Sequence, residues 1–165
     1  MNPKLLVAGI GNIFLGDDAF GVEVVQRLAQ QTLPEGVIVR DFGIRSYDLA
    51  YALMDHWDLV ILVDALSRGE RPGTVYTFEP EIGGNDETGA TPDAHSMNPV
   101  AVLQLVKAMG GTPSRLLVVG CEPASVEPDA EGNIGLSEAV SAAVPEAVKV
   151  IEELIFRERS LVTAA

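Results

Sequence analysis

The sequence predicts an α/β fold: a single-domain three-layer sandwich in which a mostly parallel, twisted sheet of about five strands carries helices on both faces. Three observations lead to this fold. Short, continuous apolar runs end in Gly or Asp, which is typical of strands covered on both faces. Segments with a helical spacing of apolar residues lie between these runs. This alternation predicts parallel β-α-β units, and the length of 165 residues fits one domain.

Five segments carry a strand pattern. The runs at residues 4–11, 58–65 and 115–121 are continuous and apolar, as in strands that are buried on both faces. A fourth run, at residues 36–43, is rich in β-branched side chains. The fifth, at residues 73–80, alternates between the two faces, which predicts a half-exposed strand at the edge of the sheet.

Helices are predicted between and after the strands. Apolar residues recur at three- and four-residue spacing over residues 20–28. A second helix is expected to begin at Pro99, with Asn98 as its N-cap. The apolar face at residues 140–155 contains Pro145, which predicts a kink or the start of a new helix there, so that a short helix runs into a longer one.

We expect residues 1–158 to form one domain and leave residues 159–165 as an unassigned tail. Neither an internal repeat nor a domain linker is evident. The segment at residues 79–96 is rich in Gly, Asp and Thr and is long for a loop in a compact domain. It therefore predicts a mobile loop near a functional site.

The charge and composition exclude several classes of partner. Acidic residues outnumber basic ones by 24 to 11, for a formal net charge of −13. Such a charge repels nucleic acid and anionic lipid, so we expect no nucleic acid or membrane partner. No apolar run approaches the roughly 20 residues of a membrane span, and the N-terminal segment shows no secretory signal. The single cysteine cannot form an internal disulfide, and a cytoplasmic location is expected.

Polar side chains gather at the carboxyl ends of the predicted strands, where ligands bind in open parallel sheets. Asp17 and Asp18 follow the first strand, Asp64 ends the central strand, and His95 precedes the helix at Pro99. Each residue also has an ordinary explanation: helix N-capping for the adjacent aspartates, a turn at the strand end for Asp64, and a surface loop position for His95. Brought together, two carboxylates and one imidazole could ligate a divalent transition metal, or act as acid and base around a peptide carbonyl.

Two other sites are possible. Gly9-x-Gly11 opens like a dinucleotide-binding loop, and Asp41 stands where a ribose-binding acid would be expected. However, Phe14 occupies the third glycine position, and the adjacent aspartates oppose a pyrophosphate. Cys121 could be a nucleophile, although cysteine at the end of an apolar strand is more often simply buried.

The chain resembles the hydrogenase maturation endopeptidases in four ordered motifs. These enzymes trim the C-terminus of the nickel-iron hydrogenase large subunit. The motifs here are "GIGNIFLGDDAFG" from Gly9, "LVDA" at the end of the central strand, "DAHSMNP", and "VGCEPASVEP". The resemblance covers nearly the whole chain, and its specificity lies in the ordered set, because each motif alone is common.

The resemblance implies which residues form the site. Asp18, Asp64 and His95 would contact nickel and form the catalytic set, with their individual roles left open. The best-known members carry Glu where this chain has Asp18, and Asp17 is the neighbouring alternative ligand. Asp41 matches a family position linked to substrate or metal recognition.

The resemblance also implies the reaction. The chain would be a hydrolase of the aspartyl endopeptidase-like kind that removes the C-terminal extension of the nickel-loaded [NiFe] hydrogenase large-subunit precursor. Nickel would arrive with that substrate and act as the recognition signal, and no organic cofactor is expected. Two alternatives remain: a nucleotide-binding α/β module, and a chaperone that senses the metal centre without cutting the chain.

Overall fold

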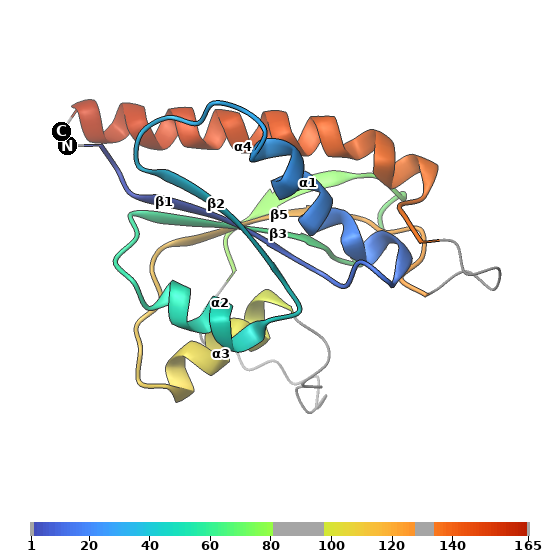
Figure 1. The fold of residues 1–165 in the computed structure, drawn as a ribbon, viewed down its shortest axis with the longest axis horizontal. Helices are drawn as coiled ribbons and strands as arrows, with labels where there is room; N and C mark the ends of the chain where they lie inside the picture. The colour runs from blue at the N-terminus through green and yellow to red at the C-terminus, as the bar shows by residue number, and fades with distance from the viewer. Residues whose placement is uncertain (1, 81–97, 128–133, 165) are drawn as a thin grey trace.

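The computed structural model describes residues 2–80, 98–127 and 134–164 and shows the predicted α/β sandwich (Figure 1). One five-stranded sheet has the order β2-β1-β3-β5-β4. Its strands are β1 (Leu5–Ile10), β2 (Val37–Gly43), β3 (Leu59–Ala65), β4 (Val75–Phe78) and β5 (Leu116–Cys121). Four strands are parallel, whereas β4 pairs with β5 in the antiparallel direction. The prediction of an edge strand within residues 73–80 is confirmed.

Helices cover both faces of the sheet (Figure 1). They are the 3₁₀ helix η1 (Gly16–Ala19), then α1 (Phe20–Leu28), α2 (Ser46–Leu53), α3 (Pro99–Ala108) and α4 (Glu138–Ala164). The α1 and α4 helices pack on one face and build one core cluster with it. The α2 and α3 helices build a second cluster on the opposite face. Alternate residues of each strand enter the two clusters, which explains why β1 and β3 are buried along their whole length.

The C-terminal helix differs from the prediction. Pro145 lies inside one continuous helix of 27 residues, so the expectation of two successive helices was wrong. The side chains of one face, including Val144, Val148 and Ile151, are buried against α1 and the sheet. Proline has no backbone N–H, so the helix lacks one hydrogen bond at Pro145. Burial of the apolar face stabilises the helix despite this loss. The helix also continues through residues 159–164, which the sequence left unassigned.

Two further features bear on the sequence predictions. The α2 helix was not predicted, although Leu49 and Leu53 are buried on the face that meets α3. The loop proposed for residues 79–96 falls mainly on 81–97, which lie outside the described residues.

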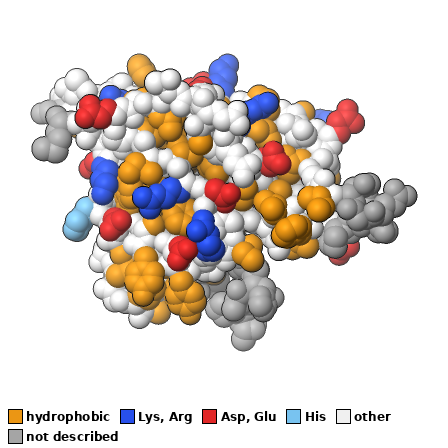
Figure 2. Space-filling model, in the orientation of Figure 1, with side chains coloured by type: hydrophobic (Ala, Val, Ile, Leu, Met, Phe, Trp, Pro, Cys, Tyr) orange, Lys and Arg blue, Asp and Glu red, His pale blue; other side chains and the backbone are white. Residues whose placement is uncertain are grey.

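Within the described ranges, no helix is both long and apolar enough to cross a bilayer. On the face drawn in Figure 2, Lys and Arg side chains lie between Asp and Glu side chains.

Candidate functional site

The carboxylate of Asp64 is the most unusual group at the carboxyl edge of the sheet. Asp64 is the sixth residue of β3, and the residue is only 2% exposed. Its neighbours Val63 and Ala65 point into the α1–α4 core, so strand alternation directs Asp64 to the face covered by α2 and α3. Within the described residues, its Oδ2 atom has no hydrogen-bond partner. An unpartnered buried carboxylate oxygen is costly unless a ligand satisfies it.

Asp18 lies in the turn that joins β1 to α1. Its Oδ2 atom accepts a hydrogen bond of 2.7 Å from the backbone N–H of Asn12, which closes the turn on itself. Gly11 makes this turn possible: its φ is +138°, and a Cβ atom there would lie 1.8 Å from the carbonyl oxygen of Asp18. No other residue type fits so close an approach, and the glycine thereby determines where Asp18 sits.

Asp18 and Asp64 interact electrostatically. Burial raises the pKa of Asp18, while the hydrogen bond from Asn12 partly opposes the rise. The pKa of Asp64 is raised well above its ordinary value, first by burial and then by the negative charge of Asp18, with the Ala65 amide opposing. A buried carboxylate whose proton affinity is raised further by a neighbouring carboxylate is disposed to share a cation with it or to hold a proton. The structure thus brings two of the three predicted site residues together.

His95, the third member of the predicted set, lies outside the described residues. The helix that follows it is described, and its N-cap is confirmed: Asn98 Oδ1 accepts a 2.7 Å hydrogen bond from the N–H of Ala101, and Pro99 is the first helical residue. The α3 helix packs on the same face of the sheet to which Asp64 is directed. Among the described residues, no group of three or more His, Cys, Asp or Glu side chains is arranged to hold a metal ion.

Asp17 has a different role from the predicted helix N-cap, which was wrong. The residue before η1 is Leu15 and the residue before α1 is Ala19, and neither end is capped by a side chain. The buried carboxylate of Asp17 instead accepts four hydrogen bonds from two later segments. The donors are the N–H groups of Ala124 at 2.8 Å, Ser125 at 3.2 Å and Ser137 at 2.7 Å, and the Ser137 hydroxyl at 3.0 Å.

These four bonds separate the roles of the adjacent aspartates. Because both Asp17 oxygens are already engaged by protein donors, the side chain has little capacity left for a metal ion. Among the described residues, Asp18 accepts one such bond, from Asn12. Asp18 is therefore the better candidate ligand, and Asp17 fastens its turn to the loop after β5 and to the start of α4.

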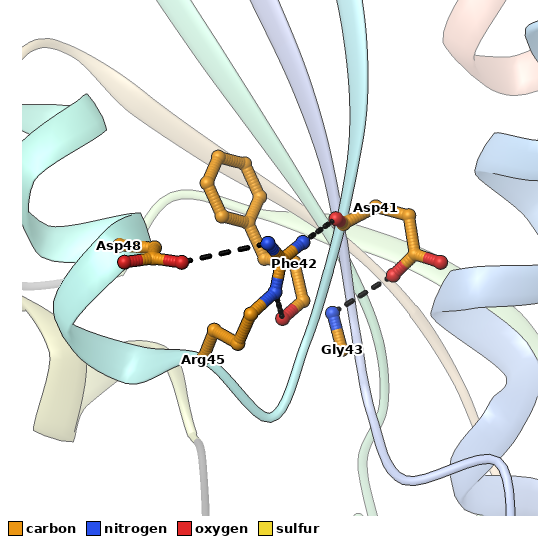
Figure 3. Close-up of polar contacts among 5 residues, drawn as sticks. All are labelled: Asp41, Phe42, Gly43, Arg45 and Asp48. Carbon is orange, nitrogen blue, oxygen red and sulfur yellow. Dashed lines mark hydrogen bonds and ion pairs between the residues drawn. The ribbon is translucent and has the colours of Figure 1, made fainter.

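Asp41 lies on the other side of the sheet from Asp64. It pairs with Gly9 on the face of β1 that meets α1, and its Oδ2 atom accepts a 3.4 Å hydrogen bond from Gln26 of α1. Its Oδ1 atom accepts a 2.8 Å hydrogen bond from the N–H of Gly43 (Figure 3). The structure therefore does not bring the Asp41 carboxylate to the Asp18–Asp64 pair.

An open groove of about 730 Å³ lies beside Asp41, between the end of β2 and α2. Arg45 crosses this groove: its guanidinium donates to the carbonyl oxygens of Asp41 and Phe42 and forms an ion pair of 3.4 Å with Asp48 (Figure 3). The other lining residues are Arg40, Tyr51, Ala52 and Asp55. The sequence did not reveal this groove, because it depends on the unpredicted helix α2.

Gly9 and Gly21 have a packing role rather than a phosphate-binding one. A Cβ atom at Gly9 would lie 2.4 Å from the Gly21 carbonyl oxygen and from a methyl group of Val25. A Cβ atom at Gly21 would lie 2.1 Å from the Val63 carbonyl oxygen. Helix α1 thus packs directly on the backbone of β1 and β3. Asp17 and Asp18 lie just before its first residue. This arrangement opposes the nucleotide-binding interpretation.

The environment of Cys121 opposes a cysteine nucleophile. The side chain is fully buried in the α1–α4 core. Burial, followed by the charges of Asp17, Glu146 and Glu122, raises the pKa of the thiol to about 12. A thiol with this pKa is almost entirely protonated at neutral pH, and the protonated form is a poor nucleophile.

Comparison with known proteins identifies the family of this chain. The family model described as hydrogenase maturation protease matches residues 22–154. The chain is 31% identical to the hydrogenase 2 maturation protease of Escherichia coli over 150 residues, which are 90% of this chain and 88% of the relative.

Solved structures show the same likeness. A hydrogenase maturating endopeptidase from E. coli is 29% identical, with a TM-score of 0.74 and coverage of 93% of each chain. A [NiFe] hydrogenase maturation protease from Thermococcus kodakarensis is 26% identical, with a TM-score of 0.66 and coverage of 93% of each chain. The family match spans more than half of the chain, and the relatives are covered almost completely. The chain belongs to the hydrogenase maturation protease family, the peptidases that cleave the C-terminus of the hydrogenase large subunit.

Proposed function

We propose that this peptidase removes the C-terminal extension of a nickel-loaded [NiFe] hydrogenase large-subunit precursor, and that it recognises the nickel through Asp18, Asp64 and His95. The observation that carries the proposal is the buried Oδ2 atom of Asp64, which has no partner within the described residues. The family membership supports the substrate class, and the name of the T. kodakarensis relative supports the [NiFe] type.

The nickel belongs to the substrate in this proposal. Carboxylate oxygens and imidazole nitrogens are ligands that divalent first-row metals accept. A metal-bearing substrate that approaches Asp18 and Asp64 offsets the mutual repulsion of the two carboxylates and supplies a partner for the unpaired oxygen. The precursor without nickel offers neither gain, so the pair can distinguish the loaded from the empty precursor.

Hydrolysis requires a base near the scissile bond. Water attacks the peptide carbonyl, a carboxylate takes the proton from the water, and the same proton then passes to the leaving amine. The Asp18–Asp64 pair can supply this base, because the pKa of each carboxyl is raised above that of an exposed aspartate. A carboxylate with a raised pKa accepts a proton more readily at neutral pH. The metal held by the substrate would polarise the carbonyl or the water.

The direct test of the assignment is cleavage of the nickel-loaded precursor by site variants. Asp18→Asn, Asp64→Asn and His95→Ala are expected to lose most cleavage, each with wild-type circular dichroism. Glu153→Gln is the matched control, because Glu153 is an exposed carboxylate on α4, far along the chain from the site. Full activity in all three site variants would overturn the assignment.

The chaperone alternative makes a different prediction about the same mixture. A protein that only senses the metal centre would bind the precursor and leave its mass unchanged. Intact mass measurement of the large subunit after incubation separates the two: the proposed function requires a loss equal to the C-terminal extension.

A further inference from the structure

An arginine and two aromatic rings form a cluster beside Asp64. The guanidinium carbon of Arg68 lies 4.9 Å from the ring centroid of Tyr76 and 4.2 Å from that of Phe78. The two rings belong to β4 and lie 6.1 Å apart, centroid to centroid. We call these three residues the Arg68 cluster. Arg68 itself is exposed, in the loop that leaves β3 directly after Asp64 and Ala65.

The strand register places this cluster next to the carboxylate pair. Asp64 pairs with Gly120 of β5, and Gly120 pairs with Tyr76 of β4. Paired residues direct their side chains to the same face of the sheet. A Cβ atom at Gly120 would lie 2.5 Å from the Tyr76 ring, so this glycine leaves room for the ring on that face. Asp64 and Tyr76 are two strands apart, roughly 10 Å between backbones.

The cluster is held in place by bonds to the surrounding loops. The backbone N–H of Arg68 donates a 2.7 Å hydrogen bond to the buried carboxylate of Glu122. The Tyr76 hydroxyl donates to the carbonyl oxygen of Leu66. Stacking on two rings restricts the Arg68 side chain and leaves the edge of its planar guanidinium available for hydrogen bonds. Within the described residues, the guanidinium is held by the rings and donates to no carboxylate.

We propose that the Arg68 cluster is a substrate-binding subsite in which the Arg68 guanidinium receives a carboxylate of the precursor polypeptide. This inference rests on the proposed function, because it assumes a polypeptide whose scissile bond lies at Asp18 and Asp64. The guanidinium fork matches a carboxylate with two parallel hydrogen bonds. A chain with a net charge of −13 repels acidic segments of a substrate, and a fixed cation beside the reacting centre locally reverses that repulsion.

The distance between Arg68 and the Asp18–Asp64 pair determines which kinetic constant Arg68 affects. Arg68 would hold a part of the substrate that does not react, so its contact is made equally in the bound state and in the transition state. Such an interaction lowers KM and leaves kcat nearly unchanged. Because the side chain is ordered by the rings before binding, little conformational entropy is lost when the carboxylate arrives.

The test compares Arg68→Ala with Arg71→Ala in steady-state cleavage of the nickel-loaded precursor. Arg71 is an exposed arginine three residues along the same loop. Within the described part of the chain, its hydrogen bonds are those that its backbone carbonyl accepts from Thr74. Both variants remove one positive charge. We expect Arg68→Ala to raise KM about 10-fold or more while kcat stays within about 2-fold. Arg68→Lys should recover only part of the affinity because lysine lacks the fork.

Two precursor forms identify the carboxylate. One carries a C-terminal amide in place of the free acid, and the other carries amides in place of the acidic side chains of its extension. If the subsite is correct, one of these two forms has a higher KM than the unmodified precursor with the wild-type protein. With that form, Arg68→Ala causes no further increase in KM. Equal KM for Arg68→Ala and Arg71→Ala, or no effect of either precursor form, would overturn the subsite while the wild type still cleaves. A wild type that does not cleave would contradict the proposed function itself.

Discussion

The Asp17 carboxylate and Ser137, which are 120 positions apart in the sequence, are joined by two hydrogen bonds. Asp17 Oδ1 accepts the Ser137 N–H at 2.7 Å, and Oδ2 accepts the Ser137 hydroxyl at 3.0 Å. This contact fastens the turn that carries Asp18 to the start of α4. The position of the candidate site therefore depends on a part of the chain that contributes no candidate ligand.

Replacement of Asp17 by alanine should destabilise the protein strongly. The change leaves the N–H groups of Ala124, Ser125 and Ser137 without their acceptor in a part-buried location. We expect a loss of about 2–4 kcal/mol in the free energy of unfolding, measured by urea denaturation. Ser137→Ala removes the hydroxyl's bond to Asp17 and the 3.4 Å bond that the hydroxyl accepts from the Val140 N–H, but it leaves the Asp17 carboxylate in place, and should cost about 1–2 kcal/mol. A cost for Asp17→Ala no larger than that of Ser137→Ala would contradict this role.

Gly11→Ala should disturb the site more than a glycine replacement at another position with positive φ. The new methyl group would overlap the Asp18 carbonyl oxygen, 1.8 Å from the built Cβ position. Gly110 is the control: its φ is +79°, and a Cβ atom there meets nothing within 4 Å. Gly110→Ala should cost about 1 kcal/mol from backbone strain alone, whereas Gly11→Ala should cost more and abolish cleavage. Unfolding curves and precursor cleavage measure the two effects, and equal behaviour of the variants would refute the steric argument.

Asp64→Asn should stabilise the folded protein at neutral pH while it abolishes cleavage. The pKa of Asp64 is raised above the ordinary 3.8, so ionisation favours the unfolded state as the pH rises from about 3.8 through the folded-state pKa. The neutral amide avoids this cost, and we expect a gain of about 1–3 kcal/mol at pH 7. The gain should disappear below about pH 3.8, where both states are protonated. Thermal unfolding of both proteins across this range tests the sign; a variant less stable than wild type at pH 7 would contradict it.

Cys121 should be unreactive in the native protein and dispensable for cleavage. Its burial and a thiol pKa of about 12 leave almost no thiolate at neutral pH. Iodoacetamide should label Cys121 only after denaturation, as detected by intact mass. Cys121→Ala should retain cleavage, with a modest loss of stability from the vacated space. Rapid native labelling together with loss of cleavage in Cys121→Ala would restore the cysteine-nucleophile alternative.

The sequence was sufficient to predict the sheet, whereas the site at its carboxyl edge stays a prediction. Continuous apolar runs identified β1, β3 and β5, because strands buried on both faces contain few polar residues. The two outer strands, β2 and β4, were identified by β-branched residues and by alternation between faces. Asn98 and Pro99 identified the start of α3, because capping chemistry is local. Residues at the carboxyl ends of parallel strands lie at one edge of the sheet, which predicts that Asp18 and Asp64 are close together. The effect of the Asp18 charge on the pKa of Asp64 agrees with this prediction.

Features that depend on tertiary contacts were not predictable. Pro145 is tolerated inside α4 because the packed apolar face on either side of it holds the helix together. Asp17 looked like a helix cap in the sequence, and nothing local indicates its bonds to Ser125 and Ser137. Arg68 and Tyr76 become neighbours only through the antiparallel pairing of β4 with β5.

The most direct test of the central claim is the intact mass of the large-subunit precursor after incubation with the wild-type protein, with and without nickel bound to the precursor. Recognition of the metal through Asp18, Asp64 and His95 predicts that only the nickel-loaded precursor loses the mass of its C-terminal extension. Equal cleavage of the loaded and the nickel-free precursor would contradict the account.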